Sequence, residues 1–227
     1  MGIHFSPKVA TTGLIASYDA AATRSYPGSG GTWNDLSGLG NNLTIQGSAT
    51  TSTMGGATAF NLNADGKYFS GTLSGTMPTT NATLEAWIYP GASEVTVGDR
   101  GTVILIHGGS SIYMSWNKDN RYLSNYWYSH SPEGYHETNG PSSRSAWTHW
   151  CSVWNYSDGK LYQWVNGSKT SATTSGNATT GTSLNIGREG SSRQFSGGIA
   201  VIRVYNTALT DAEVTSNFGA LRARFGI

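Results

Sequence analysis

The feature that most constrains the fold of this 227-residue chain is a series of short alternating segments separated by turn residues. In residues 82–89, Leu84, Ala86 and Ile88 occupy every second position, which is the period of a β-strand with one face toward a core. The dipeptides Asp158-Gly159 and Asn166-Gly167 follow two later segments of this kind. They favour type I′ turns, in which both central residues have positive φ. We therefore expect a meander of three antiparallel strands that begins near residue 146.

Similar signals recur along most of the chain. The run from Val103 to Ile106 is apolar throughout, which predicts a strand buried on both faces. Residues 19–56 are rich in loop-forming residues, and residues 168–183 are predicted to be a connection rich in Ser, Thr and Gly. The predicted strands cover residues 13–18, 43–45, 82–89, 102–107, 112–117, 121–128, 146–155, 160–165, 184–188 and 195–205.

One helix is predicted, over residues 210–223. Thr210 and Glu213 have the spacing of a capping box, and Val214, Phe218 and Leu221 follow at the spacing of one apolar stripe. The pattern as a whole predicts an all-β protein, a sandwich of two antiparallel sheets with a short C-terminal helix. We expect an N-terminal arm over residues 1–12 and a single domain over residues 13–227.

Charge and hydropathy exclude several classes of partner. The formal net charge is +1 with dispersed Lys and Arg, so we expect no nucleic acid as a partner. No run approaches the 18 apolar residues of a membrane span, so we expect no membrane insertion. The single cysteine, Cys151, cannot form an internal disulfide; its phase with Trp147 and Val153 predicts a small core residue.

The sequence offers little for catalysis, and we expect a protein that is not an enzyme. Glycoside hydrolysis needs two carboxyl groups across the scissile bond, and only Glu85 lies on a predicted strand, without an acidic partner at position 83 or 87. His130, Glu133 and His136 have a spacing that a helix would cluster, but Pro132 and Gly134 argue against a helix. We therefore interpret these three as residues of a surface loop rather than a zinc site.

A cluster of aromatic and polar residues is the best candidate for ligand binding. Sugars present C–H faces to aromatic rings and hydroxyl groups to Asn and Asp, so a rigid aromatic plate beside fixed polar groups suits them. Alternation along residues 121–128 divides this cluster between two faces, and the alternative is that its rings pack between the sheets or against another subunit. The candidate ligand-binding residues are Trp116, Asn117, Asp119, Tyr126, Trp127, Tyr128, Tyr135 and His136.

Several stretches resemble the concanavalin A-like, laminin-G-like jelly-roll superfamily, and particularly its bacterial and phage branch. The stretch around Trp33-Asn34-Asp35-Leu36-Ser37 is similar to one that recurs in phage virion proteins, and the tail around Asn217-Phe218-Gly219 is similar to phage-encoded members. The resemblance spans roughly residues 13–227, and the matching stretches are residues 13–21, 25–38, 82–90, 147–150, 159–167, 195–210 and 217–226.

The resemblance implies a jelly-roll fold and a location in the virion. It implies a non-enzymatic surface protein (capsid decoration, fibre or tail component) with other virion proteins as partners, and a glycan of the host surface as a ligand. Virion architecture also suggests a homo-oligomer. The alternatives are a carbohydrate-binding module of a bacterial cell surface and a polysaccharide depolymerase.

Members of this superfamily often hold a structural calcium ion, although we expect no cofactor here. Asp19 and Asp35 are the candidate metal ligands, because Ca²⁺ prefers carboxylate and carbonyl oxygens from loops. Asn61 and Asn63 stand where many members carry an acidic residue, which argues against a site that uses this stretch. The alternative is that Asp19 and Asp35 bind backbone N–H groups of nearby turns.

Overall fold

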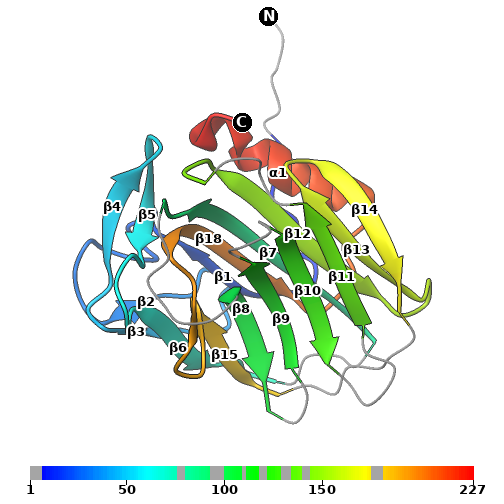
Figure 1. The fold of residues 1–227 in the computed structure, drawn as a ribbon, viewed down its shortest axis with the longest axis horizontal. Helices are drawn as coiled ribbons and strands as arrows, with labels where there is room; N and C mark the ends of the chain where they lie inside the picture. Colours follow the sequence, from blue (N-terminus) through cyan, green and yellow to red (C-terminus); the bar gives the residue numbers. More distant parts are fainter. Residues whose placement is uncertain are drawn as a thin grey trace, which may run out of the picture.

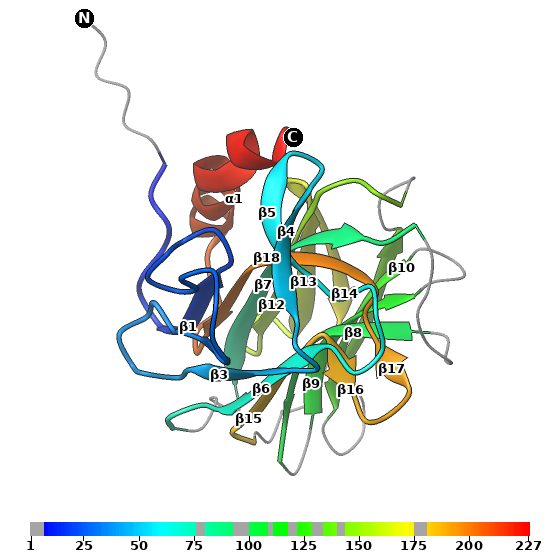
Figure 2. The same cartoon turned by 90° about the vertical axis from the view of Figure 1, so that its left-hand side faces the viewer.

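Two sheets packed face to face and one C-terminal helix make up the part of the protein that the structure describes (Figures 1 and 2). The computed structural model describes residues 7–75, 80–92, 100–108, 111–117, 122–128, 134–139, 144–174 and 181–227. Within 122–128 and 134–139 it describes the backbone throughout and the side chains of residues 123–125, 136 and 137. The arrangement confirms the predicted sandwich of two antiparallel sheets closed by a short helix.

Sheet A carries the helix on its outer face. It contains the predicted meander as three neighbouring strands, which Asp158-Gly159 and Asn166-Gly167 connect. In order across the sheet, its strands are β14 (Ser168–Thr173), β13 (Lys160–Val165), β12 (Thr148–Asn155), β7 (Asn81–Pro90), β18 (Gly197–Tyr205), β5 (Ala57–Asn61) and β4 (Thr50–Met54), and β1 (Leu14–Asp19) pairs with β18.

Sheet B forms the opposite layer. Its strands are, in order, β11 (Gly134–Asn139), β10 (Tyr122–Tyr128), β9 (Ser111–Asn117), β8 (Arg100–His107), β15 (Ser183–Ile186), β6 (Tyr68–Thr72), β3 (Leu43–Gln46) and β2 (Thr32–Trp33). A short hairpin of β16 (Arg188–Glu189) and β17 (Arg193–Gln194) joins this sheet beside β8.

The core between the sheets is rich in aromatic rings. Trp33, Phe60 and Phe69 form a triangle with ring centroids 4.7–4.8 Å apart, and edge or tilted contacts of this kind stabilise a core beyond the area they bury. Leu84 and Ile88 of β7 belong to this core, as their alternation predicts. The main structure-forming signal in the sequence is therefore confirmed.

Helix α1 (Asp211–Phe225) packs on the outer face of sheet A (Figure 2). Thr210 caps it with the predicted capping box, and the helix extends two residues beyond the expected end to the left-handed Gly226. The Trp87 ring of β7 stacks on Phe225 at 4.2 Å between centroids. No helix among the residues that the structure describes is long and apolar enough to cross a membrane.

The described part of the predicted N-terminal arm lies against this helix. The backbone N–H of Ala10 donates to Asn217 Oδ1 at 2.7 Å, and Ser216 Oγ donates to the carbonyl oxygen of Lys8 at 2.7 Å. Residues 7–10 are thus tied to α1 by hydrogen bonds that span most of the sequence. Residues 1–6 lie outside the described part of the chain.

A buried carboxylate of sheet A, paired with an arginine of the same sheet, also binds α1. Glu85 lies fully buried on the outer face of β7, away from Leu84, where Arg203 Nη1 of β18 donates to its Oε1 at 2.8 Å. Asn217 Nδ2 of α1 donates to its Oε2 at 2.7 Å, and His149 Nε2 of β12 lies 3.2 Å from Oε1. Burial alone would raise the pKa of Glu85, but Arg203, His149 and Asn217 outweigh that effect and lower it to about 2.

Several elements differ from the sequence-based expectation. Residues 168–173 form strand β14 rather than part of a connection, and residues 50–61 form the β4–β5 hairpin inside and beyond a segment predicted to be loop-rich. Both are dominated by Thr, Ser and Ala, so the strands depend on pairing with a neighbour and carry little apolar pattern of their own. Cys151 is buried beneath α1 beside Val153 and Val214, as expected of a core residue.

The depressed pKa of Glu85 predicts a specific acid sensitivity. The folded protein binds the Glu85 proton less tightly than the unfolded chain does, so the carboxylate contributes full stability above about pH 4.5 and loses it as the pH falls toward about 2. At 1.36 kcal/mol per pKa unit, this contribution is about 3 kcal/mol. Urea unfolding at pH 7 and pH 3 should show a smaller acid-induced loss for Glu85→Gln than for the wild type. An equal loss in both proteins would contradict the assignment.

Candidate binding site

Two residues of the predicted ligand-binding cluster lie between the two sheets. Trp116 of β9 is 2% exposed and belongs to the core between the sheets, which is the packing alternative that the sequence left open. His136 lies on β11 rather than in a surface loop, and its Nε2 is 2.9 Å from Thr170 Oγ1 of β14 in the other sheet. Burial in this position lowers the pKa of His136. These two residues therefore face the interior of the sandwich.

Most of the remaining members of that cluster are placed by their position in β9, β10 and β11. Tyr126 pairs with Tyr113 of β9 and with Tyr135 of β11 in the strand register. Asn117 is the last residue of β9 and is partly exposed. Asp119 lies outside the described residues, as do the side chains of Tyr126, Trp127, Tyr128 and Tyr135.

Alternation along β10 is confirmed where side chains are described. Leu123 is buried in the core opposite Trp116. The next residue, Ser124, has its hydroxyl group 2.6 Å from Glu137 Oε1 of β11, to which it donates. Glu137 is a residue of β11, so this hydrogen bond joins two neighbouring strands.

The carboxylates of the two candidate calcium ligands bind other groups of the protein. Asp35 accepts hydrogen bonds from the backbone N–H groups of Ser17, Ser37 and Asn41 at 2.8–3.1 Å, and a fourth from Ser37 Oγ. Asp19 pairs with Arg224 at 2.7 Å. Across the described ranges no group of three or more His, Cys, Asp or Glu residues could hold a metal ion. The turn-binding alternative describes both residues, since the backbone N–H of Ala21 donates to Asp19 Oδ1 at 2.9 Å, and the donor set does not fit calcium.

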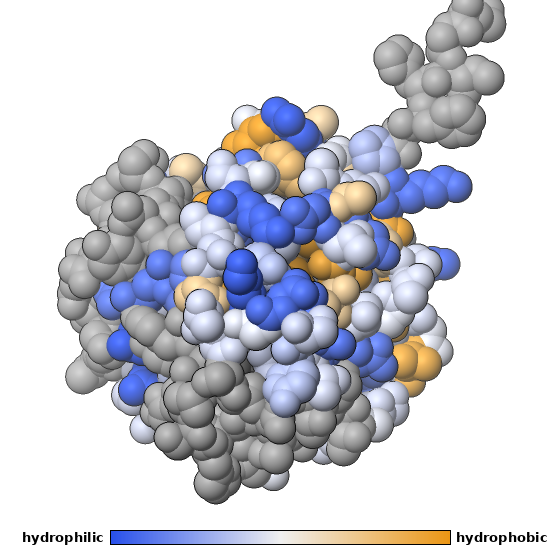
Figure 3. All heavy atoms as spheres, turned by 90° about the vertical axis from the view of Figure 1, so that its right-hand side faces the viewer, coloured by the Kyte–Doolittle hydropathy of each residue, from blue (hydrophilic) through white to orange (hydrophobic). Residues whose placement is uncertain are grey.

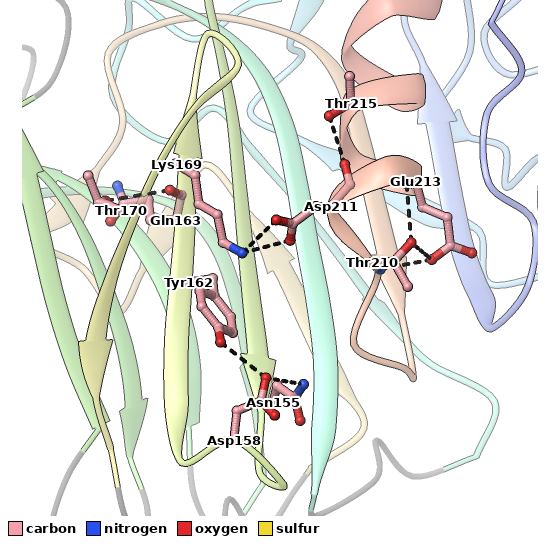
Figure 4. Close-up of polar contacts among 10 residues, drawn as sticks. All are labelled: Asn155, Asp158, Tyr162, Gln163, Lys169, Thr170, Thr210, Asp211, Glu213 and Thr215. Atoms are coloured by element: carbon pink, nitrogen blue, oxygen red, sulfur yellow. Dashed lines mark hydrogen bonds and ion pairs between the residues drawn. The ribbon is translucent and has the colours of Figure 1, made fainter.

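A different cavity combines aromatic and polar groups on the outer face of sheet A. It has a volume of about 260 Å³ and lies beside the N-terminus of α1; we call it the Tyr162 cavity (Figure 4). Seen from the edge of the sandwich where β14 lies, the described surface is mostly hydrophilic, with apolar areas between the polar side chains (Figure 3). The cavity is lined by Val153, Asn155, Asp158, Tyr162, Trp164, Lys169, Ala208, Leu209, Thr210 and Asp211.

One wall of the Tyr162 cavity is a hydrogen-bonded group at the β12–β13 turn. The Tyr162 hydroxyl group donates to Asp158 Oδ2 at 3.1 Å, and Asn155 Nδ2 donates to the same oxygen at 2.9 Å (Figure 4). Burial against its neighbours, the hydrogen bond to Asp158 and the nearby charge of Asp211 all raise the pKa of Tyr162. The phenol therefore stays protonated and acts as a fixed donor, and Asp158 keeps its Oδ1 available as an acceptor.

The other wall is an ion pair between β14 and α1. Lys169 Nζ lies 2.7 and 2.8 Å from the two carboxylate oxygens of Asp211 (Figure 4). The same ammonium group lies 4.1 Å from the centroid of the Tyr162 ring and 4.9 Å from that of Trp164. The helix position of Asp211 is fixed locally, because Thr215 Oγ1 donates to its carbonyl oxygen at 2.7 Å and Thr210 caps the helix.

Alternation in β13 explains why these rings line a cavity. Leu161 belongs to the core between the sheets and Gln163 is fully buried, so Tyr162 and Trp164 point to the outer face. The same alternation in residues 160–165 was available in the sequence and could have identified both rings. The sequence could not have identified the contribution of Asp211, because that contribution depends on where α1 packs on sheet A.

Comparisons with known proteins agree with this architecture. The model of the concanavalin A-like lectin/glucanases superfamily matches residues 63–215, about two thirds of the chain, and the protein belongs to this family. A search of curated protein sequences gave no match. Jelly-roll domains of this family occur in binding proteins and in enzymes alike, so membership defines the fold and leaves the function to the site.

Solved structures with the same fold include binding domains. The binding domain of botulinum neurotoxin serotype D matches with a TM-score of 0.72 and 13% identity, over 92% of this chain and 52% of that one. The binding domain of botulinum neurotoxin DC in complex with SialylT matches with a TM-score of 0.70 and 13% identity, over 93% and 52%. This chain therefore spans about half the length of these toxin domains.

A third structure matches over nearly its whole length. Domain 4 of AbnA, an extracellular arabinanase from Geobacillus stearothermophilus, was solved in complex with arabinotriose. It matches with a TM-score of 0.64 and 20% identity, over 90% of this chain and 97% of that one. At these identities the likeness shows the shared fold.

Proposed function

We propose that this protein is a non-catalytic carbohydrate-binding domain that holds a sugar in the Tyr162 cavity. The observation that carries the proposal is the grouping of a tyrosine, an asparagine, a lysine and two aspartates around one cavity of about 260 Å³. Aromatic surface beside a few convergent polar groups is the usual composition of a small-molecule site. The volume lies just below the range of about 300–1,000 Å³ that is typical of drug-sized ligands, which suits one residue of a longer saccharide.

The polar groups of the cavity match the hydroxyl groups of a sugar. Asp158 and Asp211 offer acceptors, whereas Asn155 and Lys169 offer donors. Two carboxylates and one ammonium group give these residues a formal charge of −1. Such a site favours a neutral or amino sugar over an acidic one, because its net negative charge would repel a carboxylate on the sugar.

The positions of the carboxylates argue against hydrolysis. Glu85, the strand acid that the sequence singled out, is fully buried beneath α1 and paired with Arg203, so no substrate reaches it. Asp158 and Asp211 are both exposed, and Lys169 binds both oxygens of Asp211. Neither provides the sheltered carboxylic acid that protonates a leaving group in glycoside hydrolysis.

The comparisons support binding rather than cleavage as the role. One structure with this fold is a domain of an arabinanase in complex with arabinotriose, and another is a toxin binding domain in complex with SialylT. The arabinanase domain matches over nearly its whole length, whereas this chain corresponds to about half of the toxin domain. We extend that role to this chain on the strength of the Tyr162 cavity.

A glycan array tests this proposal with a matched pair of tyrosine variants. Tyr162→Ala removes the ring and the hydroxyl donor of the cavity, and should weaken binding of the recognised glycan by about tenfold, which is 1.4 kcal/mol. Tyr156→Ala removes another exposed tyrosine of the same hairpin, 46% exposed and outside the cavity lining, and should bind as the wild type does.

Asp158→Asn provides a second test that keeps the shape of the cavity. It removes the charged acceptor and should also weaken binding, while circular dichroism confirms that both cavity variants are folded. A wild-type protein that binds nothing on a broad array would contradict the proposal. So would a Tyr162→Ala variant that binds as strongly as Tyr156→Ala.

For its biological setting, we place the domain on the surface of a phage virion, as capsid decoration or as a fibre or tail component. Support comes from the similarity of residues 25–38 and 217–226 to stretches of phage virion proteins. In this setting other virion proteins and further copies of the chain would be neighbours, and a glycan of the host surface would be the ligand. The polar, weakly charged composition suits a particle that must avoid nonspecific binding to polyanions.

Mass spectrometry of purified particles tests the setting. We expect peptides of this chain in particles banded on a density gradient, in a constant ratio to the major capsid protein. Their absence from particles, with the chain found instead on bacterial surfaces, would favour the carbohydrate-binding module of a bacterial cell surface.

A further inference from the structure

A second cavity lies on the outer face of sheet B, apart from α1 and the Tyr162 cavity. It has a volume of about 370 Å³. Figure 2 shows the strands that form it, β6, β15 and β16, grouped at the end of the molecule away from the helix. We call it the Arg188 cavity, and its lining residues are Tyr68, Ser70, Asn185, Arg188, Gly190 and Ser191.

Strand register explains why these polar residues share one surface. Phe69 of β6 pairs with Ile186 of β15, and both are fully buried in the core. Ser70 and Asn185 form the neighbouring pair, so they occupy the opposite, outward face. The β16–β17 hairpin adds Arg188 at the edge of that face, and Gly190 turns the hairpin with a φ of +58°.

Arg188 is held in place without an acidic partner. Its Nε donates to the carbonyl oxygen of Gly190 at 2.6 Å, and its guanidinium carbon lies 5.2 Å from the centroid of the Tyr68 ring. The adjacent Glu189 binds Arg193 instead, at 3.2 Å to each carboxylate oxygen. No acidic side chain in the described part of the chain pairs with Arg188, so its two terminal nitrogens remain available to a ligand.

We propose that the Arg188 cavity binds a carboxylate-bearing saccharide, a polymer that contains uronic or sialic acid. A guanidinium group whose plane is fixed by a ring and a carbonyl group matches a carboxylate through two parallel hydrogen bonds. The same cavity offers hydrogen-bond partners for sugar hydroxyl groups at Ser70, Asn185 and Ser191. The Tyr68 ring offers an apolar surface.

The charge of the cavity favours a carboxylate over a phosphate. Among the described residues of the lining, Arg188 is the one that is charged, and it carries a single positive charge. Phosphate sites commonly gather several cations or the backbone N–H groups of a helix N-terminus, and the lining includes neither. The two cavities thus select differently: the Tyr162 cavity carries a net negative charge, and the Arg188 cavity carries a positive one.

The experiment compares two ligands that differ in a carboxylate. Isothermal titration calorimetry should use the full chain carrying Tyr162→Ala, because the Tyr162 cavity would itself bind the neutral oligomer. This variant should bind an oligomer of glucuronic acid about tenfold or more tightly than a glucose oligomer of equal length and linkage, because the carboxylate forms charge-assisted hydrogen bonds with Arg188. An oligomer of N-acetylneuraminic acid, run in parallel, distinguishes the sialic from the uronic source. In the same background, Arg188→Ala should lose the preference for the acid. Arg188→Lys should recover only part of it, because lysine lacks the planar fork.

Arg222→Ala is the matched control. Arg222 also donates its Nε to a carbonyl oxygen, that of Ile227, and its guanidinium carbon lies 5.3 Å from the Phe218 ring. Its removal changes the net charge by the same amount at a distant place, so binding of the acidic oligomer should stay at the wild-type level. Tyr162→Ala should also keep this binding, which separates this proposal from the function of the other cavity.

Three results would overturn the inference. The first is equal affinity of the Tyr162→Ala chain for the acidic and the neutral oligomers, including no binding of either. The second is an Arg188→Ala variant, shown by its thermal unfolding midpoint to be folded, that retains the preference for the acid. The third is an equal loss in Arg188→Ala and Arg222→Ala, which would indicate nonspecific attraction to net charge.

Discussion

The contacts of one carboxylate, buried beneath the C-terminal helix, fix the position of that helix on sheet A. Glu85 stays charged in an interior position because Arg203 of the next strand and Asn217 of the helix both donate to it. A buried ion that loses one partner costs several kcal/mol, so this contact fixes α1 in one position on sheet A. Asn217 extends the constraint to the N-terminal segment, because it also accepts the N–H of Ala10. Stacking of Trp87 on Phe225 holds the far end of the same helix.

The position of the helix decides what the outer face of sheet A can bind. The N-terminus of α1 places Asp211 against Lys169, and this ion pair closes the cavity that Tyr162 and Trp164 line. Glu85, the one acid on a strand that the sequence singled out, therefore positions the helix, and the surface beside the helix N-terminus carries the groups for which we propose recognition of a sugar. On sheet B, α1, the one helix among the described residues, does not cover Tyr68, Asn185 and Arg188, and a separate cavity with the opposite charge lies there. The two layers of one sandwich thus present cavities of opposite charge.

The sequence predicted much of the fold and little of the site, for physical reasons. Strict alternation identified β7 and its core face at Leu84 and Ile88, and the capping box at Thr210 located α1. These signals are local, whereas β4 and β14 consist of small polar residues that become strands by pairing. Aromatic density favoured residues 116–136 as the site, but Trp116 packs in the core and His136 between the sheets. Asp158 and Asp211 are 53 residues apart in the sequence and line one cavity because of tertiary packing. No pattern in the sequence predicts that they lie close together.

Backbone amide chemical shifts during titration with an array-selected oligosaccharide test the central claim most directly. We propose that this sandwich binds a sugar beside the helix N-terminus and leaves it intact. We predict shift changes concentrated in residues 155–169 and 208–211, with the anomeric signals of the ligand unchanged in number over a day. Shift changes confined to other parts of the chain, or new anomeric signals from freshly formed reducing ends, would contradict the account.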